Sequence, residues 1–462
     1  MPQFVKRSPM PVSARALFDW HERPGAFERL TPAWQPTRVI SRTGGITNGS
    51  RVEVEVPVLG GLLHQRMLME HRDYVAGSRF TDVLVEGPFA RWAHTHTMEP
   101  QPDGTSVLVD AIDYALPIGA LGEAVAGWFV RGQLQELFAF RHARTRADLT
   151  QHMAYAHLPR LTIAITGGTG MIGSALTALL RTGGHTVRWI TRSPDAERGD
   201  IGWDPDAGTL DPAALAGVDA VVHLAGANVG ERWTAEHKQA IRSSRERGTR
   251  TLVSALVKMP NQPQSLISGS AVGYYGDTGS KVIDEASPIG SGFLADVSRG
   301  WEGETAAADA AGIRVAIART GVVLSPAGGA LAKMLPPFRL GLGGPLGSGE
   351  QWMSWISLED EIAALYFLLM HQECRGPFNL TAPTPVTNAT FGSTLGSVLR
   401  RPAVLPVPAF ALKALFGEMA EGTILAGQRV LPTRLQAAGF RFQHPDLTSA
   451  LQAELGVGLA TG

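Results

Sequence analysis

The run LTIAITGGTGMIGSALTALL, residues 161–180, constrains the fold of this chain more than any other segment. Six strand-type residues lead into a turn that carries Gly167, Gly170 and Gly173, and an apolar helical pattern starts at once. A turn this tight needs residues without a Cβ, because the strand, turn and helix backbones approach one another closely. The segment therefore predicts the first strand, turn and helix of a doubly wound parallel sheet.

The same turn predicts a site for a dinucleotide. One glycine permits the tight turn, one lets a pyrophosphate approach the backbone, and one lets the helix pack on the strand. The N-terminus of the helix offers N–H groups and the positive end of its dipole to the phosphates. The residues predicted to contact the cofactor are Gly167, Thr169, Gly170, Met171, Ile172, Gly173, Arg192, Leu224, Ala225 and Gly226.

The end of the second strand favours NADP(H) over NAD(H). Sites for NAD(H) place an Asp or Glu near this point, where it accepts a hydrogen bond from the ribose 2′-OH. Here the strand ends in Thr191, Arg192 and Ser193, with no acid. The guanidinium of Arg192 can instead pair with a 2′-phosphate. The alternative is that Arg192 is a solvated surface residue.

Residues 1–152 have a different pattern. Two short helical patterns come first and a long amphipathic one comes last, and between them turn signals divide strand-type runs. The helical patterns cover 13–20, 25–30 and 121–151, and the strand-type runs cover 51–58, 78–87, 91–100 and 105–116. This order predicts an α+β domain in which a curved antiparallel sheet grips one long helix.

Beyond a linker predicted over 152–160, apolar strand-type runs alternate with helical patterns. These runs cover 161–166, 186–191, 220–226, 265–271 and 314–320. Alternation with short connections is typical of a parallel, doubly wound sheet. We therefore predict an α/β domain over 160–400, followed by a small helical cap over 401–456.

Two resemblances to known families follow from these segments. FDWHERPGAFERLTPAW (18–34) and FRHARTRADL (140–149) resemble the START/polyketide-cyclase-like (SRPBCC) helix-grip superfamily. That resemblance implies a ligand-binding domain over 1–152, with a cavity between sheet and helix that suits an apolar ligand.

The second resemblance covers nearly all of 161–455. TGGTGMIG, then HLAG (223–226), SGSAVGYYGD (268–277) and DEASPIGSGFLADVSRGWE (284–302) resemble the atypical epimerase-like branch of the extended short-chain dehydrogenase/reductases. It implies a Rossmann domain, a nicotinamide cofactor and a substrate cleft under a small C-terminal domain.

Typical members of that superfamily use a Tyr-x-x-x-Lys pair to move the proton that accompanies hydride transfer. When Glu302 is aligned with the acid that usually follows the Lys, Leu294 and Ser298 occupy the two positions, so the pair is missing. The catalytic residues predicted instead are Ser270, Tyr274, Tyr275 and Arg245.

Each of these four residues has an expected role. We expect Ser270 to hydrogen-bond a substrate oxygen and one of the two tyrosines to transfer the proton. Arg245 replaces the Asn that normally faces the site, and we expect its charge to lower the pKa of that tyrosine. Further polar candidates are Asn228, Arg232, Asp284, Glu285, Gln351 and Trp352, for which helix capping and loop fixing are equal alternatives.

Other features limit the classes of function. His94 and His96 share a strand face, but with no clear carboxylate partner we expect sheet-face or cavity histidines and no metal. The single cysteine, Cys374, excludes a disulfide framework. A net charge of −1 implies no nucleic-acid partner, and the apolar run 362–370 is too short to span a bilayer.

Two functions remain in competition. The first is an enzyme that carries out NADP(H)-dependent redox or epimerase chemistry on a small, hydrophobic substrate presented by the helix-grip domain. The second is a non-catalytic sensor or scaffold that binds NADP(H). We expect a cytoplasmic protein in both cases, and the oligomeric state stays open.

Overall fold

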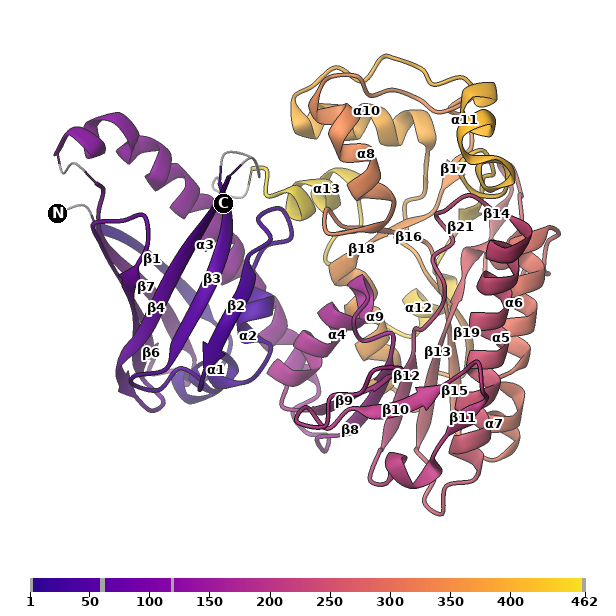
Figure 1. Cartoon of the computed structure of the whole chain (residues 1–462), viewed down its shortest axis with the longest axis horizontal. Helices are drawn as coiled ribbons and strands as arrows, with labels where there is room; N and C mark the ends of the chain where they lie inside the picture. The colour runs from indigo at the N-terminus through magenta and orange to yellow at the C-terminus, as the bar shows by residue number, and fades with distance from the viewer. Residues whose placement is uncertain (1–2, 59–62, 118–119, 459–462) are drawn as a thin grey trace. The chain divides into compact units, whose positions relative to one another are not determined.

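The computed structural model describes residues 3–58, 63–117 and 120–458 (Figure 1). The chain divides into two compact units. The first comprises 1–159 with 181–184 and 455–462, and the second comprises 160–180 and 185–454.

The first unit contains a seven-stranded antiparallel sheet. Its order is β1 (Gln3–Met10), β7 (Ser106–Ala115), β6 (Arg91–Pro100), β5 (Arg79–Glu86), β4 (Leu63–Val75), β3 (Arg51–Val58) and β2 (Arg38–Thr43). The four strand-type runs predicted from the sequence are all strands. Strands β1, β2 and β4 were not predicted. The edge strand β2 is exposed at all six positions, so it lacks the apolar alternation that identifies a half-buried strand.

Three helices accompany this sheet: α1 (Ala14–Glu22), α2 (Ala26–Leu30) and α3 (Ala120–Ala154). Ser13 caps α1, since its hydroxyl oxygen accepts a hydrogen bond from the backbone N–H of Ala16. The side chains of Leu134 and Phe138 on α3 pack against Phe4 and Ile112 of the sheet. Helix α3 extends to Ala154, so the predicted linker over 152–160 is helical at its start.

The second unit is built on an eight-stranded sheet. Its order is β11 (Thr209–Leu210), β10 (Ile201–Asp204), β9 (Thr186–Thr191), β8 (Thr162–Thr166), β12 (Ala220–His223), β13 (Ser265–Ala271), β15 (Arg314–Thr320) and β19 (Gly376–Leu380). Every pairing is parallel except that of β10 with β11. The predicted doubly wound sheet is therefore confirmed. Its strand order reverses at β8, and ligands of such sheets bind at this switch point.

Helices α4 (Met171–Thr182), α5 (Ala235–Val257), α6 (Phe293–Gly303) and α9 (Leu358–Met370) belong to this unit. The apolar run 362–370 lies in α9, where every residue from Ile362 to Met370 is buried. Over the ranges given above, no helix combines the length and the hydrophobicity needed to cross a membrane.

The C-terminal part is mainly helical and is tied to the parallel sheet. It contains α11 (Ala409–Phe416), η4 (Ala420–Ile424), β21 (Arg429–Val430), α12 (Thr433–Ala437) and α13 (Leu447–Leu455). Strand β21 pairs in parallel with β14 (Val282–Ile283). The buried carboxylate of Glu285 accepts hydrogen bonds from the backbone N–H groups of Asn379 on β19 and Arg434 on α12.

Candidate functional site

The glycine turn after β8 is too closely packed for side chains at two of its positions. Gly167 has a φ of +70°, and a Cβ there would lie 2.9 Å from the carbonyl carbon of Leu224. A Cβ at Gly173 would lie 2.2 Å from the carbonyl oxygen of Gly167. The first N–H groups of α4 have no partners within the helix and open onto this turn. The turn therefore has the backbone geometry of a phosphate cradle.

A buried hydrogen-bond chain holds the segment after β12 against this turn. Thr166 Oγ1 accepts from the backbone N–H groups of Leu224 at 3.0 Å and Ala225 at 3.1 Å, and it lies 2.7 Å from His223 Nδ1. On the other side of the imidazole, His223 Nε2 lies 3.0 Å from the hydroxyl of Thr249. That hydroxyl donates to the carbonyl of Arg245.

The protonation of His223 follows from this chain. Since the hydroxyl proton of Thr249 is already used, His223 donates from Nε2, and Nδ1 accepts from Thr166. Complete burial lowers the pKa of His223 to about 4, which agrees with a neutral ring. Sequence reasoning missed this residue as a support of the site, although it stands in the HLAG segment.

Arg192 lies on the surface directly after β9. Its side chain has no hydrogen-bond or ion-pair partner among the residues that the structure describes. In the same loop, the guanidinium of Arg198 is occupied, because it pairs with Asp200 at 2.9 Å. Arg192 is thus an uncommitted cation beside the strand that flanks the glycine turn.

A buried polar network lies at the carboxyl ends of β13 and β15. Ser270 Oγ donates to Glu302 Oε1 at 2.6 Å. Arg319 donates to both oxygens of Glu302, at 2.8 Å each, and to Tyr275 Oη at 2.9 Å. Tyr275 in turn donates to Asn379 Oδ1 at 2.8 Å. The Arg319 and Glu302 side chains are only 4% and 11% exposed.

The cation beside the two tyrosines is Arg319, whereas the sequence analysis expected Arg245. The Arg319 guanidinium lies 3.5 Å from the ring centre of Tyr274 and 5.2 Å from that of Tyr275. Sequence reasoning used Glu302 only to align the chain and missed Arg319, because neither of the two arginines in the run RVAIART stands in a recognisable motif. Its role becomes visible only when β15 pairs with β13.

The predicted lowering of a tyrosine pKa is wrong for Tyr275. Burial raises the pKa of its phenol above the ordinary value, and this effect outweighs the opposing influence of Arg319. The charge of Arg319 is already neutralised by Glu302 in a bidentate pair. Tyr275 is therefore a committed structural donor, and Tyr274 is the tyrosine of the two that is partly exposed.

Arg245 supports the segment that follows β12. Its Nη1 donates to the carbonyl oxygens of Ala227 at 3.0 Å and Ile241 at 3.2 Å, and its guanidinium stacks over the ring of Trp301. The neighbouring Ser244 accepts from the backbone N–H of Ala227. Burial lowers the pKa of Arg245 to about 10. No described carboxylate pairs with this guanidinium.

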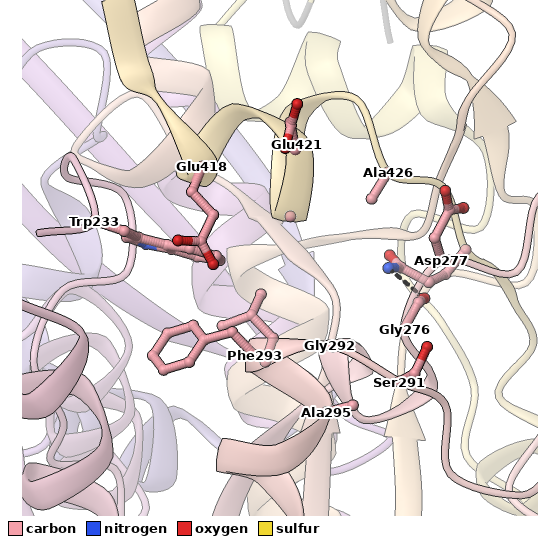
Figure 2. A pocket seen from close by; sticks show the side chains of 14 residues that line it. Trp233, Gly276, Asp277, Ser291, Gly292, Phe293, Ala295, Glu418, Glu421 and Ala426 are labelled. Carbon is pink, nitrogen blue, oxygen red and sulfur yellow. Dashed lines mark hydrogen bonds between the residues drawn. The ribbon is translucent and has the colours of Figure 1, made fainter. Parts of the chain in front are cut away.

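A cavity of about 260 Å³ lies in the second unit (Figure 2). Its described lining residues do not include the predicted catalytic residues Ser270, Tyr274, Tyr275 and Arg245. It is bounded by the 3-10 turn η3 (Val272–Tyr275), the first turn of α6 and residues around η4. Aromatic and aliphatic side chains from Trp233, Phe293 and Leu294 form one part of its lining, and carboxylates form another. The carboxylates belong to Asp277, Glu418 and Glu421.

Among the six further polar candidates, five have structural partners. They exchange hydrogen bonds with backbone groups or stack on a neighbouring side chain: Asn228, Asp284, Glu285, Gln351 and Trp352. Capping and loop fixing thus account for these contacts. Arg232 is exposed and lies beside Gly417.

The expectation that His94 and His96 lack a carboxylate partner is wrong. His94 Nε2 lies 2.9 Å and His96 Nδ1 lies 2.6 Å from Asp110 Oδ1. Asp82 approaches both rings from the other side. These carboxylates come from the two strands that flank β6, so only the strand register brings them to the histidines.

Comparison with known proteins places the chain in a family. The profile of the NAD-dependent epimerase/dehydratase family matches residues 163–380, and a domain family of unknown function, DUF1731, matches 407–454. The chain is 49% identical over 290 residues to the epimerase family protein Mb2239 of Mycobacterium bovis, with 63% of this chain and 96% of that protein covered.

Two solved structures extend the comparison. The nucleoside-diphosphate sugar epimerase of Corynebacterium glutamicum superposes with a TM-score of 0.79 at 33% identity, covering 98% of this chain and 90% of that one. The human epimerase family protein SDR39U1 (isoform 2), solved with NADPH, superposes with a TM-score of 0.57 at 36% identity, covering 64% and 99%. The chain therefore belongs to the NAD-dependent epimerase/dehydratase family.

Proposed function

We propose that the chain binds NADP(H) at the glycine turn and carries out an oxidoreductase or epimerase reaction on a small molecule in the cavity beside η3 and α6. The observation that carries this proposal is the cradle itself. Side chains are excluded at Gly167 and Gly173, and the free guanidinium of Arg192 lies next to the same strand pair. The NADPH in the structure of the human relative supports the choice of cofactor.

The cofactor-binding roles are proposed for the residues around this cradle. Gly167, Gly170 and Gly173 shape the turn, and the backbone N–H groups of Met171 and Ile172 face the phosphates at the start of α4. Arg192 pairs with the 2′-phosphate. Thr169 and the segment 224–226 form the remaining walls of the cofactor site. The hydroxyl oxygen of Thr166 holds this segment by accepting hydrogen bonds from its backbone.

In catalysis, the bound nicotinamide supplies or accepts a hydride. Tyr274 is our candidate for the acid or base that transfers the accompanying proton. Its ring lies on the Arg319 guanidinium, and unlike Tyr275 it is partly exposed. Ser270 lies at the end of β13, and its hydroxyl donates a hydrogen bond to Glu302. We propose that a substrate oxygen accepts from the same hydroxyl. Arg245 acts by holding the backbone at Ala227, with its charge available to an anionic group.

Two observations favour a non-catalytic NADP(H)-binding sensor or scaffold as the second candidate. Leu294 lines the cavity at the position aligned with the usual catalytic tyrosine. The hydroxyls of Ser270 and Tyr275 are both engaged in hydrogen bonds within the chain. Under this proposal cofactor binding persists and no substrate is turned over.

For the first unit we propose a START-like helix-grip domain that binds a ligand of its own. The seven-stranded antiparallel sheet and the 35-residue helix α3 support this assignment. The two family matches, at 163–380 and 407–454, share only residues 181–184 with this unit.

The cofactor proposal is tested by calorimetry with NADPH and NADH. We expect NADPH to bind more tightly, by about 1–3 kcal/mol for a charge-assisted phosphate pair. Arg192→Ala should remove most of that difference. Arg198→Ala is the matched control, because it removes an arginine of the same loop that is already paired with Asp200. Equal affinities of the unmodified chain for NADPH and NADH would refute the assignment of Arg192.

Turnover separates the enzyme from the sensor. The purified chain with NADPH is assayed against carbonyl compounds and, for epimerisation, against nucleotide sugars followed by chromatography. Consumption of NADPH or interconversion of a sugar that depends on Tyr274 supports the enzyme. Tight NADPH binding without either signal supports the sensor.

A further inference from the structure

A cluster of histidines and aspartates lies inside the first unit, apart from the site described above. Two histidines come from β6, His94 and His96, and the carboxylates Asp82 and Asp110 come from the neighbouring strands β5 and β7. His142 of α3 reaches the cluster from the helix side. His94, His96, Asp110 and His142 are at most 5% exposed.

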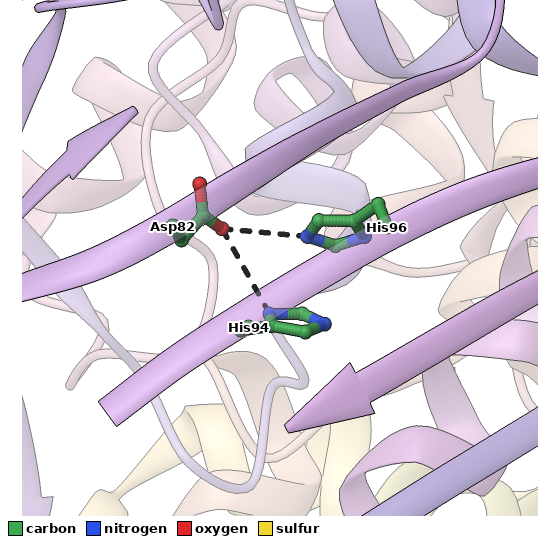
Figure 3. Close-up of side chains that lie close together, drawn as sticks. All are labelled: Asp82, His94 and His96. Atoms are coloured by element: carbon green, nitrogen blue, oxygen red, sulfur yellow. Dashed lines mark hydrogen bonds and ion pairs between the residues drawn. The ribbon is translucent and has the colours of Figure 1, made fainter. Parts of the chain in front are cut away.

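The strand register puts these groups on one face of the sheet. Asp82 is directly opposite His94 in the pairing of β5 with β6, and His96 is directly opposite Asp110 in the pairing of β6 with β7. Residues two apart on β6 share a face. Figure 3 shows Asp82 directed at both imidazoles.

Three ligand-type atoms converge on one point. Asp82 Oδ2 lies 3.3 Å from His96 Nε2 and 3.8 Å from His94 Nδ1, and the three residues offer atoms that all lie within 4.8 Å of one another. In a tetrahedral zinc site with metal–ligand bonds of about 2.0–2.1 Å, neighbouring ligand atoms are about 3.3 Å apart. The two distances from Asp82 are already close to this value, and the third pair, which lies within 4.8 Å, would contract when an ion binds.

The outer nitrogens of both rings point to a second carboxylate. His94 uses Nδ1 toward Asp82 and Nε2 toward Asp110, and His96 uses Nε2 toward Asp82 and Nδ1 toward Asp110. The other oxygen of Asp110 lies 2.6 Å from His142 Nε2. A histidine that binds a metal through one ring nitrogen is commonly oriented by a carboxylate that contacts its other nitrogen. Asp110 contacts that other nitrogen in both His94 and His96.

Some buried atoms of this cluster contact a described partner at short distance without the direction of a hydrogen bond. His96 Nδ1 is buried and makes no hydrogen bond of acceptable geometry, although it lies 2.6 Å from Asp110 Oδ1. The same holds for His71 Nδ1 and Asp82 Oδ1, which lie 2.5 Å apart. These contacts lie on the outer sides of the rings, whereas His94 Nδ1 and His96 Nε2 face Asp82 Oδ2.

The donor set of the cluster also fits a cation. The carboxylates of Asp82 and Asp110 lie 2.6–3.8 Å from nitrogens of the His94 and His96 rings. Neutral imidazole nitrogens and carboxylate oxygens are the forms in which these side chains bind a metal ion.

We infer that Asp82, His94 and His96 bind a divalent transition-metal ion, with Asp110 as the residue that orients both imidazoles. Two nitrogens and one carboxylate oxygen are a donor set that suits Zn²⁺ and related first-row ions. The side chains of His71 and Asp82 are 12% and 21% exposed, so the cluster has an edge through which an ion can enter.

The test uses the full chain, stripped with a chelator and titrated with Zn²⁺ in competition with a coloured indicator. We expect one Zn²⁺ per chain and a rise in the melting temperature. Asp82→Asn and His96→Gln should abolish this binding, and Asp110→Asn should weaken it about 10–100-fold, as loss of a carboxylate behind a ligand does elsewhere. His64→Ala is the matched control, because His64 lies exposed on β4 of the same sheet.

A second measurement covers the event that a variant fails to fold. X-ray absorption of the unmodified chain with Zn²⁺ should show only nitrogen and oxygen ligands, with the multiple-scattering signature of about two imidazoles. The inference is overturned if the stripped chain takes up no Zn²⁺, if the folded Asp82→Asn and His96→Gln variants bind it as the unmodified chain does, or if the absorption spectrum shows no imidazole.

Discussion

Glu302 provides a sharp test of the buried network, because it is the shared acceptor of Arg319 and Ser270. Replacing it by Gln keeps the size and shape of the side chain and removes the negative charge. The Arg319 guanidinium, only 4% exposed, then stays buried without a carboxylate. Removing one partner of a buried ion pair costs about 3–5 kcal/mol, since the remaining charge is uncompensated.

The expected loss lies at the lower end of that range. The Gln side chain keeps one carbonyl oxygen for Arg319, and Tyr275 still accepts from Nη1. A loss of about 3 kcal/mol corresponds to a fall in melting temperature of roughly 6–12 °C for a unit of this size, at about 2–4 °C per kcal/mol. Urea unfolding followed by far-ultraviolet circular dichroism gives the free energy directly.

Glu304→Gln is the matched control for this measurement. It makes the same chemical change two residues further along the chain. The Glu304 carboxylate pairs with Arg250, whose side chain is 60% exposed, and exposed pairs contribute less than about 1 kcal/mol. If Glu302→Gln destabilises the chain no more than Glu304→Gln does, the network is not the buried charge centre described above.

Three further outcomes are expected. Tyr274→Phe should reduce turnover at least 100-fold, the scale of a lost acid–base group, with little change in NADPH affinity. Tyr275→Phe should mainly lower the melting temperature. Equal effects of the two substitutions on turnover would contradict the assignment of Tyr274. Arg245→Ala should weaken NADPH binding through the released segment at Ala227, and calorimetry that finds unchanged affinity would show that this support is not needed. Burial raises the pKa of Glu361 to about 8, so between about pH 4.5 and 8 the folded chain holds one more proton than the unfolded chain. The free energy of unfolding should therefore fall as the pH rises through this window, by at most about 1.4 kcal/mol per pH unit. Glu361→Gln should remove that slope from the urea-unfolding curves, and an unchanged slope would show that another group titrates.

The sequence by itself determined the features that depend on residues close together in the chain. The turn from Gly167 to Gly173 is recognisable because its strand, glycines and helix are contiguous. The alternation of apolar runs with helical patterns was sufficient for the parallel sheet, because a buried parallel strand is apolar on both faces. Strands β2 and β4 escaped notice because their positions are exposed or mixed. In β1 burial alternates, but Lys6 and Ser8 stand at inward positions, so the sequence shows no apolar alternation.

Only the tertiary structure decided which polar groups meet. Arg319 comes to Glu302 and the tyrosines through the pairing of β15 with β13, and Asp110 comes to the histidines through the pairing of β7 with β6. A shift of one residue in either register would send these side chains to the opposite face of the sheet. The partner of a buried charge thus depends on how distant strands pair and on which side chains become buried. No periodic pattern in the nearby sequence indicates either of these.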